Sequence, residues 1–297
     1  MELVNPMNAL RDAFMSILPS VPLNVYDRYP SFPKFNMSIR IMIWNVQGAG
    51  SQAFLTMIKE LIRINKPNVL ALVETHISGD TARRVCEKIG FPGHVRVDAQ
   101  GFSGGIWLFW KDDIVSVTPM ATNNQHITVE INKIGETPWL FSAIYASPES
   151  SVRHDLWAEL EEIKRNYSGP WLLGGDFNDT TSMSERNGVG GSEMQRRCRL
   201  FSEWVNANGL IDLGFSGSPH TWFRGESEGT FKSARLDRFL ATDDWRLKFE
   251  EGSVKHLPKC GSDHCPIILS TCGFAPIPSA LRPFRFQAAW LSHKEFD

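Results

Sequence analysis

The sequence GSDHCPIIL, residues 261–269, joins a polar turn to a short run of apolar residues. The run is apolar enough to form a buried strand, so the turn places Asp263 and His264 side by side at the mouth of that strand. A carboxylate in such a position can bind a metal ion, and a histidine can move a proton. Taken alone, the pair also fits an ordinary turn or a fragment of a zinc site.

Polar residues follow four other predicted strands as well. The apolar runs 39–44, 69–73, 140–144 and 171–175 all read as strands, and each delivers a polar residue at its end. If these ends converge, they form a cup of carboxylates, amides, a phenol and an imidazole, which suits hydrolysis of a phosphodiester. The residues concerned are Asn45, Glu74, Tyr145, Asp176 and, two positions further on, Asn178.

Some of these polar residues are expected to bind a metal ion. Mg²⁺ prefers carboxylate oxygens, so Glu74 is the expected ligand, helped by Asp263 or by the carbonyl oxygen of Asn45. Such an ion would offset the negative charge that builds on the phosphate oxygens. The expected cofactor is therefore Mg²⁺, with Mn²⁺ as an alternative.

Proton transfer needs a second group of residues. We expect His264 and Asp176 to position and deprotonate a water molecule, with Asp237 holding His264 in one tautomer. The side chains of Asn45, Asn178 and Tyr145 would donate hydrogen bonds to the phosphate. Each residue also has a plainer interpretation, such as an Asx turn at Asp176 or a surface ion pair at Asp237.

The order of the predicted elements indicates an α/β fold. One helix is expected to begin at the N-cap Ser51 and to stop before Pro67, and others lie over residues 152–166 and 193–208. Consecutive antiparallel strands are expected over 105–110, 114–118, 126–131 and 139–144, followed by short strands near Thr221 and over 236–240, 253–256 and 266–270. We therefore predict a four-layer α/β sandwich, in which two mainly antiparallel sheets pack face to face between helices. Residues 37–273 would form this domain, after a poorly ordered extension at 1–36 with one short helix near 9–18, and before a linker-like tail at 274–297.

Composition limits the possible functions. The 297 residues include 31 Lys and Arg against 33 Asp and Glu, so any phosphate binding must come from local patches. The candidate patches, each equally consistent with a solvated face, are Arg83, Arg84 and Lys88; Arg196, Arg197 and Arg199; and Lys232, Arg235 and Arg238. Five scattered cysteines and the lack of a signal peptide or of about 20 consecutive apolar residues favour an intracellular protein, nuclear or cytoplasmic, that does not enter a membrane.

Two rival motifs remain open. The glycine-rich segment 48–53 fits G-x-G-x-x-A between two strands, which is typical of a dinucleotide site, but antiparallel strands follow it. The second rival is a zinc site, although the spacing of its candidate ligands along the chain matches no standard zinc finger. Its candidate ligands are His256, Cys260, His264, Cys265 and Cys272.

Six motifs in fixed order resemble those of the endonuclease/exonuclease/phosphatase superfamily, and most closely the apurinic-like endonuclease of plant non-LTR (LINE-type) retrotransposons. They are WNVQG at 44–48, ETH at 74–76, IYASP at 144–148, GGDFN at 174–178, RLDRF at 235–239 and GSDHCP at 261–266. The resemblance implies a Mg²⁺-dependent DNA endonuclease that nicks one strand and leaves a 3′ hydroxyl. It assigns Asn45 and Glu74 to the metal, Tyr145 and Asn178 to the phosphate, and Asp176, Asp237 and His264 to proton transfer.

The resemblance also sets limits. The segment 282–290 is similar to the join between this nuclease and a reverse transcriptase, a domain that we do not expect in this chain. Gln47 stands where repair enzymes of the superfamily carry an Asp, and His76 where many members have Lys. We expect a monomer that acts on DNA. A phosphatase on inositol phosphates or nucleotides and a noncatalytic nucleic-acid-binding remnant are the alternatives.

Overall fold

The structure is a computed structural model that describes residues 38–275, except 189, 226, 228 and 229. The expected extension at 1–36, its short helix and most of the tail at 274–297 lie outside the described residues.

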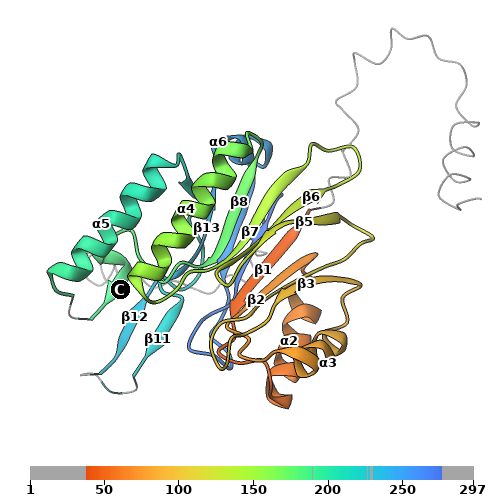
Figure 1. The fold of residues 1–297 in the computed structure, drawn as a ribbon, viewed down its shortest axis with the longest axis horizontal. Helices are drawn as coiled ribbons and strands as arrows, with labels where there is room; N and C mark the ends of the chain where they lie inside the picture. The colour runs from red at the N-terminus through yellow and green to blue at the C-terminus, as the bar shows by residue number, and fades with distance from the viewer. Residues whose placement is uncertain (1–37, 189, 226, 228–229, 276–297) are drawn as a thin grey trace, which may run out of the picture. The chain divides into compact units, whose positions relative to one another are not determined.

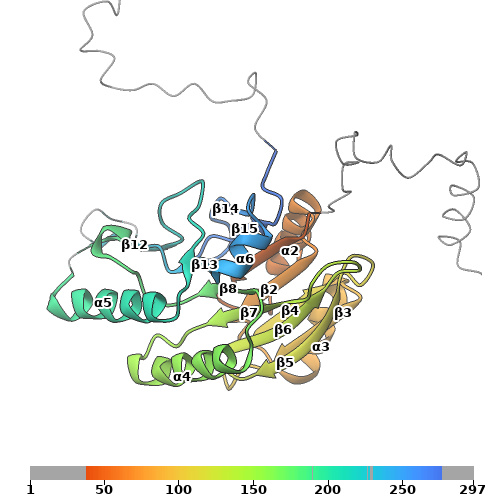
Figure 2. The same ribbon diagram turned by 90° about the horizontal axis from the view of Figure 1, so that it is seen from above.

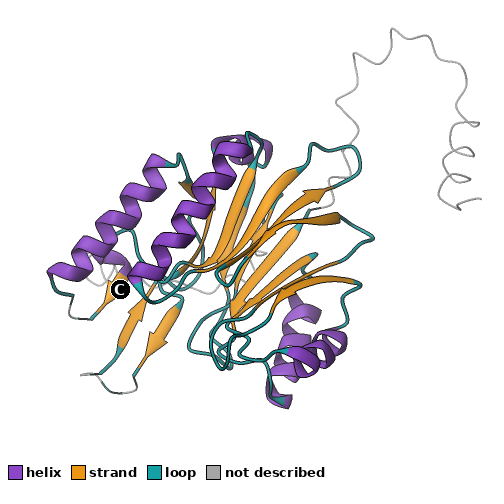
Figure 3. Ribbon diagram, viewed as in Figure 1, coloured by secondary structure: helices purple, strands orange, loops and turns teal. Residues whose placement is uncertain are grey.

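Two six-stranded sheets form the centre of the domain (Figures 1 and 3). The first sheet has the order β14-β15-β1-β2-β4-β3, with β1 Arg40–Asn45, β2 Val69–Val73, β3 Gly93–Val97, β4 Ile106–Trp110, β14 Ser253–His256 and β15 Ile267–Ser270. The second has the order β10-β13-β8-β7-β6-β5, with β5 Ser116–Thr122, β6 His126–Asn132, β7 Trp139–Tyr145, β8 Trp171–Asp176, β10 Ile211–Asp212 and β13 Asp237–Ala241. Most pairs are antiparallel, whereas β1 pairs with β2 and β7 with β8 in parallel.

Helices cover the outer faces of both sheets, as Figures 1 and 2 show. Residues of α2 (Gln52–Asn65) and α3 (Gly79–Ile89) pack on the first sheet, and those of α4 (Ser150–Asn166) and α5 (Ser192–Ala207) on the second. A short helix, α6 (Asp243–Lys248), adds Trp245 to the core between the sheets. The four-layer sandwich predicted from the sequence is confirmed.

Strand β1 shows why these sequences read as continuous apolar runs. Ile41 and Ile43 belong to the core between the sheets, whereas Met42 and Trp44 pack toward the helices on the other face. Successive side chains of a strand point to opposite faces, so a strand buried on both sides must be apolar throughout.

Several details differ from the sequence expectations. The predicted strands 105–110 and 114–118 are not paired neighbours, because β4 lies in the first sheet and β5 in the second. Helix α3, helix α6 and strand β3 were not predicted. A third sheet of order β11-β12-β9 has strands of only two or three residues. The short strand expected near Thr221 corresponds to β11 (Trp222–Arg224), whereas β9 (Arg186–Asn187) and β12 (Lys232–Ala234) were not predicted.

The topology gathers the polar strand ends at one edge. Asn45 pairs with Val73 at the carboxyl ends of the parallel strands β1 and β2, and Tyr145 pairs with Asp176 at the ends of β7 and β8. Strand β1 also contacts β8, and β2 contacts β7, across the two sheets. Residues from four strands are thereby delivered to one place.

Candidate active site

A cleft of about 560 Å³ lies at this edge of the sandwich. Of the predicted site residues, Glu74, Asn178, Asp263 and His264 line it. Asn45, Asp176 and Asp237 are almost fully buried in contact with His264. The complete lining is Gln47, Glu74, Pro148, Asn178, Arg186, Arg197, Trp222, Arg224, Leu236, Asp263 and His264.

His264 has a carboxylate on each side of its ring, one within hydrogen-bond distance and one at ion-pair distance. Its Nδ1 lies 2.8 Å from Oδ2 of Asp237, and its Nε2 lies 3.7 Å from Oδ2 of Asp176. The backbone amides of Asp237 and Leu236 donate to the hydroxyl oxygen of the buried Thr221, which fixes the strand that carries Asp237. Asp237 is therefore the buried partner of His264. The alternative interpretation of the sequence, a surface ion pair at Asp237, is wrong.

Asp176 accepts hydrogen bonds at both carboxylate oxygens. Its Oδ1 accepts the backbone N–H of Asn178 at 2.8 Å, which is the Asx turn considered from the sequence. Its Oδ2 accepts the amide of Asn45 at 3.0 Å and the amide of Asn178 at 3.3 Å. The turn and the site are therefore the same structure.

The charges of Asp176 and His264 depend on each other. Burial raises the pKa of Asp176 to about 7. Burial opposes the charged form of His264 too, but the carboxylates of Asp237 and Asp176 outweigh it and raise the pKa of His264 to about 10. The neighbouring carboxylates thus favour the charged imidazole, while burial makes Asp176 harder to ionise than an exposed carboxyl group.

The amides of Asn45 and Asn178 are occupied inside the protein. Besides Asp176, the amide nitrogen of Asn178 donates to the backbone oxygen of Ala146 at 2.7 Å. Asn45 is fully buried and does not line the cleft, and its Oδ1 accepts the N–H of Gln47. Both residues thus brace Asp176, and only Asn178 borders the space that a substrate could enter.

Tyr145 and Glu74 form a second polar contact at the edge of the cleft. Burial, together with the neighbouring Glu74 carboxylate, raises the pKa of Tyr145 well above its usual range, so the phenol keeps its proton and can donate to Glu74. Tyr145 itself lines an adjoining cavity of about 260 Å³ on the other side of Pro148.

Four residues around the cleft have left-handed backbone conformations: Gln47, Glu74, His76 and Asn178, with φ between 48° and 58°. Such conformations cost of order 1 kcal/mol or more for residues other than glycine, and they concentrate at functional sites. Apart from these four, the described residues contain one other non-glycine residue with positive φ, Lys66, at the end of α2.

The acidic residues of the cleft fit a divalent cation. Asp263 accepts a hydrogen bond from the indole of Trp222 at Oδ2, while its Oδ1 is buried without a hydrogen-bond partner. A buried carboxylate oxygen without a partner is costly, and a bound cation would satisfy it. In the part of the chain that the structure describes, the one cluster of three possible metal ligands is Asp176, Asp237 and His264. The zinc site considered from the cysteines does not form there.

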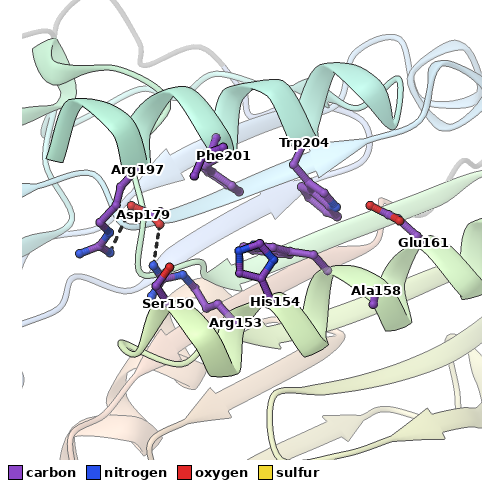
Figure 4. A pocket seen from close by; sticks show the side chains of 11 residues that line it. Ser150, Arg153, His154, Ala158, Glu161, Asp179, Arg197, Phe201 and Trp204 are labelled. Carbon is purple, nitrogen blue, oxygen red and sulfur yellow. Dashed lines mark hydrogen bonds and ion pairs between the residues drawn. The ribbon is translucent and has the colours of Figure 1, made fainter. Parts of the chain in front are cut away.

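A buried ion cluster ties the Asp176 loop to two helices. Asp179 pairs with Arg153 of α4 at 2.9 Å and with Arg197 of α5 at 3.2 Å, and Figure 4 shows it between the two guanidinium groups. Arg197 also donates to the backbone oxygen of Asn178. It borders both the cleft and a groove of about 280 Å³ between the helices. The cluster therefore fixes the position of the loop from behind.

The third sheet supplies residues that sequence reasoning missed. Arg186 and Trp222 both pair with Ala234, and Arg224 pairs with Lys232 two residues along. Residues in register, and residues two apart, lie on the same face of a sheet. Arg186, Trp222 and Arg224 line the cleft from this face. No periodic signal could have revealed them in strands this short.

The basic patches named from the sequence divide differently in the structure. Arg235 and Arg238 are buried and pair with Glu185 and Asp212, so they do not form a surface with the exposed Lys232. Arg83 pairs with Asp80 and Glu87 on the exposed face of α3. Within the three patches, Arg197 is the residue that reaches the cleft.

The fold and the site define a phosphoesterase of the α/β sandwich type, and comparison with known proteins agrees. The model of the Endonuclease/Exonuclease/phosphatase family matches residues 42–264, so the chain belongs to that family. No curated protein matches the sequence significantly.

Solved structures share the fold at low identity. The AP endonuclease LMAP of Leishmania major is 16% identical with a TM-score of 0.62, covering 88% of this chain and 94% of its own. The endonuclease domain of TRAS1, a telomere-specific non-LTR retrotransposon, is 16% identical with a TM-score of 0.57 over 78% of this chain and 97% of its own. The 3′-5′ exonuclease NExo of Neisseria meningitidis is 18% identical with a TM-score of 0.55 over 78% and 98%.

Among the described residues, no helix combines the length and the apolar character needed to cross a membrane.

Proposed function

We propose that residues 37–273 form a metal-dependent DNA endonuclease that nicks one strand and leaves a 3′ hydroxyl. The observation that carries the proposal is the buried chain of contacts from Asp237 through His264 to Asp176 and Asn45, which opens into the cleft at His264. In this arrangement a proton acceptor, Asp176, lies beside a cationic group, His264, at a cleft where a phosphodiester could bind.

The charge states suggest how the roles are divided. A general base works best with a pKa near the operating pH, and Asp176 meets that condition. His264, which the sequence suggested as the base, instead carries positive charge at neutral pH and lies where it would stabilise the charge that develops on a phosphate. Asp176 would therefore accept the proton of the attacking water, while Asp237 keeps the imidazole oriented.

A divalent cation would be held by Glu74 and Asp263, which both line the cleft, and Oδ1 of Asp263 has no hydrogen-bond partner. When bound, the cation supplies Lewis-acid stabilisation of negative charge on the phosphate.

The cationic face of the third sheet favours nucleic acid as the substrate. Arg186 and Arg224 border the cleft, and neither has an ion-pair partner among the described residues. Unpaired guanidinium groups in a row suit successive phosphates of a strand better than a single small phosphate ester. The ordered motifs, together with the likeness in fold to the TRAS1 domain, support an origin in a retrotransposon of the plant LINE type.

Plasmid nicking tests the proposal. Supercoiled plasmid is incubated with Mg²⁺ or Mn²⁺, or with EDTA, beside the variants Asp176→Asn and His264→Gln. We expect metal-dependent conversion to the open circle, slowed in each variant by about 10² or more, because Asp176→Asn removes the proton acceptor and His264→Gln removes the cation that stabilises the phosphate charge. His94→Asn, at an exposed position outside the cleft lining, serves as the control.

The products of the assay identify the ends of the nick, and a negative result distinguishes the alternative functions. A nick that a DNA polymerase extends without prior end repair has a 3′ hydroxyl. Release of phosphate from inositol phosphates or nucleotides without nicking would replace the proposal with a phosphatase. Salt-sensitive DNA binding without cleavage by any of the proteins would indicate a noncatalytic remnant.

A further inference from the structure

Glu74 and His76 form a pair of metal-ligand types at the edge of the cleft. Nε2 of His76 lies 3.5 Å from Oε2 of Glu74, and both side chains are mostly buried, with 27% and 11% exposed. The two residues have the left-handed backbone conformations noted above, on either side of Thr75. Their side chains therefore approach each other because of the backbone around them.

The backbone of this segment is clamped from both sides. Gly48 and Ala49 donate hydrogen bonds to the carbonyl oxygens of Glu74 and Thr75, while the N–H groups of Thr75 and His76 donate to Gly105 and Gly104. A strained conformation persists only where its surroundings determine it fully. The pair is therefore preorganised before any ligand arrives.

The spacing suits two ligands of one ion better than a bond between the side chains. A distance of 3.5 Å is long for a charge-assisted hydrogen bond, which usually spans about 2.7–2.9 Å. Two ligands that each lie about 2.1 Å from a metal are separated by about 3.0 Å at right angles and about 3.4 Å in a tetrahedral arrangement. Neither side chain would have to move far to share an ion.

We propose that His76 binds the divalent cation beside Glu74, and that its imidazole shifts the preference of the site from Mg²⁺ toward Mn²⁺ and similar transition metals. Imidazole suits transition metals, whereas Mg²⁺ favours oxygen ligands and water. Gln47, on the same rim of the cleft, offers an amide and no carboxylate, so the imidazole makes up for the missing ligand. The proposal rests on the metal dependence proposed above and names a residue that supplies it.

The buried cluster of Asp176, Asp237 and His264 is the rival location. There, Nδ1 of His264 already has a partner in Asp237, and the three side chains are almost completely buried. An ion at that place would have to replace contacts that are already satisfied, whereas Glu74 lines the open cleft.

Manganese bound to the complete chain gives a signal that does not depend on catalysis. Pulsed electron paramagnetic resonance detects ¹⁴N coupling when an imidazole binds Mn²⁺, and titration with Mn²⁺ and Mg²⁺ gives both affinities. The wild type should show the coupling and bind Mn²⁺ at least about tenfold more tightly than Mg²⁺. His76→Asn, in which asparagine tolerates the left-handed conformation, should lose the coupling and about tenfold or more of Mn²⁺ affinity, with the Mg²⁺ affinity changed less than about threefold.

Circular dichroism of His76→Asn checks that the variant folds, and His76→Lys provides a second substitution if it does not. Absence of ¹⁴N coupling in the wild type, or coupling that survives in both His76 variants but disappears in His264→Gln, would overturn the proposal. Coupling from His76 in a protein that never nicks DNA would leave the metal site standing while refuting the endonuclease.

Discussion

Asp176 bears the electrostatic cost of the candidate site. It is fully buried, and its hydrogen bonds from Asn45 and Asn178 offset only part of the penalty for burying a carboxylate, since its pKa remains raised. A residue kept in this state is typical of sites that trade stability for chemistry.

The pH dependence of stability tests this assignment. A raised carboxyl pKa means that ionisation penalises the native state, so the contribution of Asp176 is present below its unfolded pKa near 3.9 and is lost as pH rises toward about 7. Between pH 5 and pH 8, Asp176→Asn should therefore gain about 2 kcal/mol of unfolding free energy relative to wild type. Urea unfolding in metal-free buffer measures the difference.

Two buried histidines away from Asp176 act in the opposite direction and cancel in that comparison, whereas His264 does not, because the Asp176 carboxylate helps to raise the pKa of His264. Burial lowers the pKa of His126 and of His256, so their contributions grow as pH rises, equally in both proteins. A difference between Asp176→Asn and wild type that stays constant from pH 5 to pH 8 would show that Asp176 is ionised throughout that range.

Among the elements, the small sheet β11-β12-β9 has a defined place because the His264 loop pairs with it. The N–H of Phe223 donates to the oxygen of Asp263, and the N–H of Cys265 donates to the oxygen of Thr221. The face that carries Arg186 and Arg224 is therefore joined directly to the loop that carries His264.

The salt dependence of DNA binding tests whether Arg186 and Arg224 on that face contact DNA phosphates. In a His264→Gln background, which should not cleave, Arg186→Gln and Arg224→Gln should each weaken binding to every sequence and reduce the slope of log K against log salt by about 1. Arg84→Gln, on the exposed face of α3, is the matched control and should leave the slope unchanged. Equal slopes in all the variants would place the DNA elsewhere.

For the whole molecule, the spacing between the two sheets depends on a glycine next to the site. A Cβ atom on Gly174 of β8 would lie 2.5 Å from the ring of Phe239 and 2.6 Å from Ile43 of the opposite sheet. No side chain fits there without movement of the core.

Gly174→Ala should therefore destabilise the protein by about 1–3 kcal/mol, the usual effect of overpacking. Gly191→Ser, at the N-cap of α5 where the Cβ has open space, should change stability by less than about 0.5 kcal/mol. Chemical unfolding of the two variants checks the pair. Equal stabilities would mean that the sheets separate easily at Gly174.

The sequence was most informative where strands are buried on both faces. The apolar runs ending at Asn45, Val73, Tyr145 and Asp176 are visible because neither face meets water. Helix α3 could have been found, since Ala82, Val85, Cys86 and Ile89 follow a helical period. Strands as short as β9 and β11 carry no period at all.

Charge states were beyond sequence reasoning for a different reason. His264 and Asp237 could be paired by motif order, but the exchange of roles that we propose between His264 and Asp176 rests on their burial and mutual distance. The sequence also could not show that Lys232 is exposed while Arg235 and Arg238 are buried. That difference arises because the two arginines form ion pairs with Glu185 and Asp212.

Strand β1 lies in the middle of its sheet, between β2 and β15, although almost the whole domain separates β1 from β15 in the chain. During synthesis on the ribosome, β1 therefore cannot pair with β15 until Ser270 has been made. At ordinary rates of synthesis this is on the order of ten seconds or more after Arg40. His264 leaves the ribosome just before β15. The cleft is therefore completed only at the end of translation of the domain.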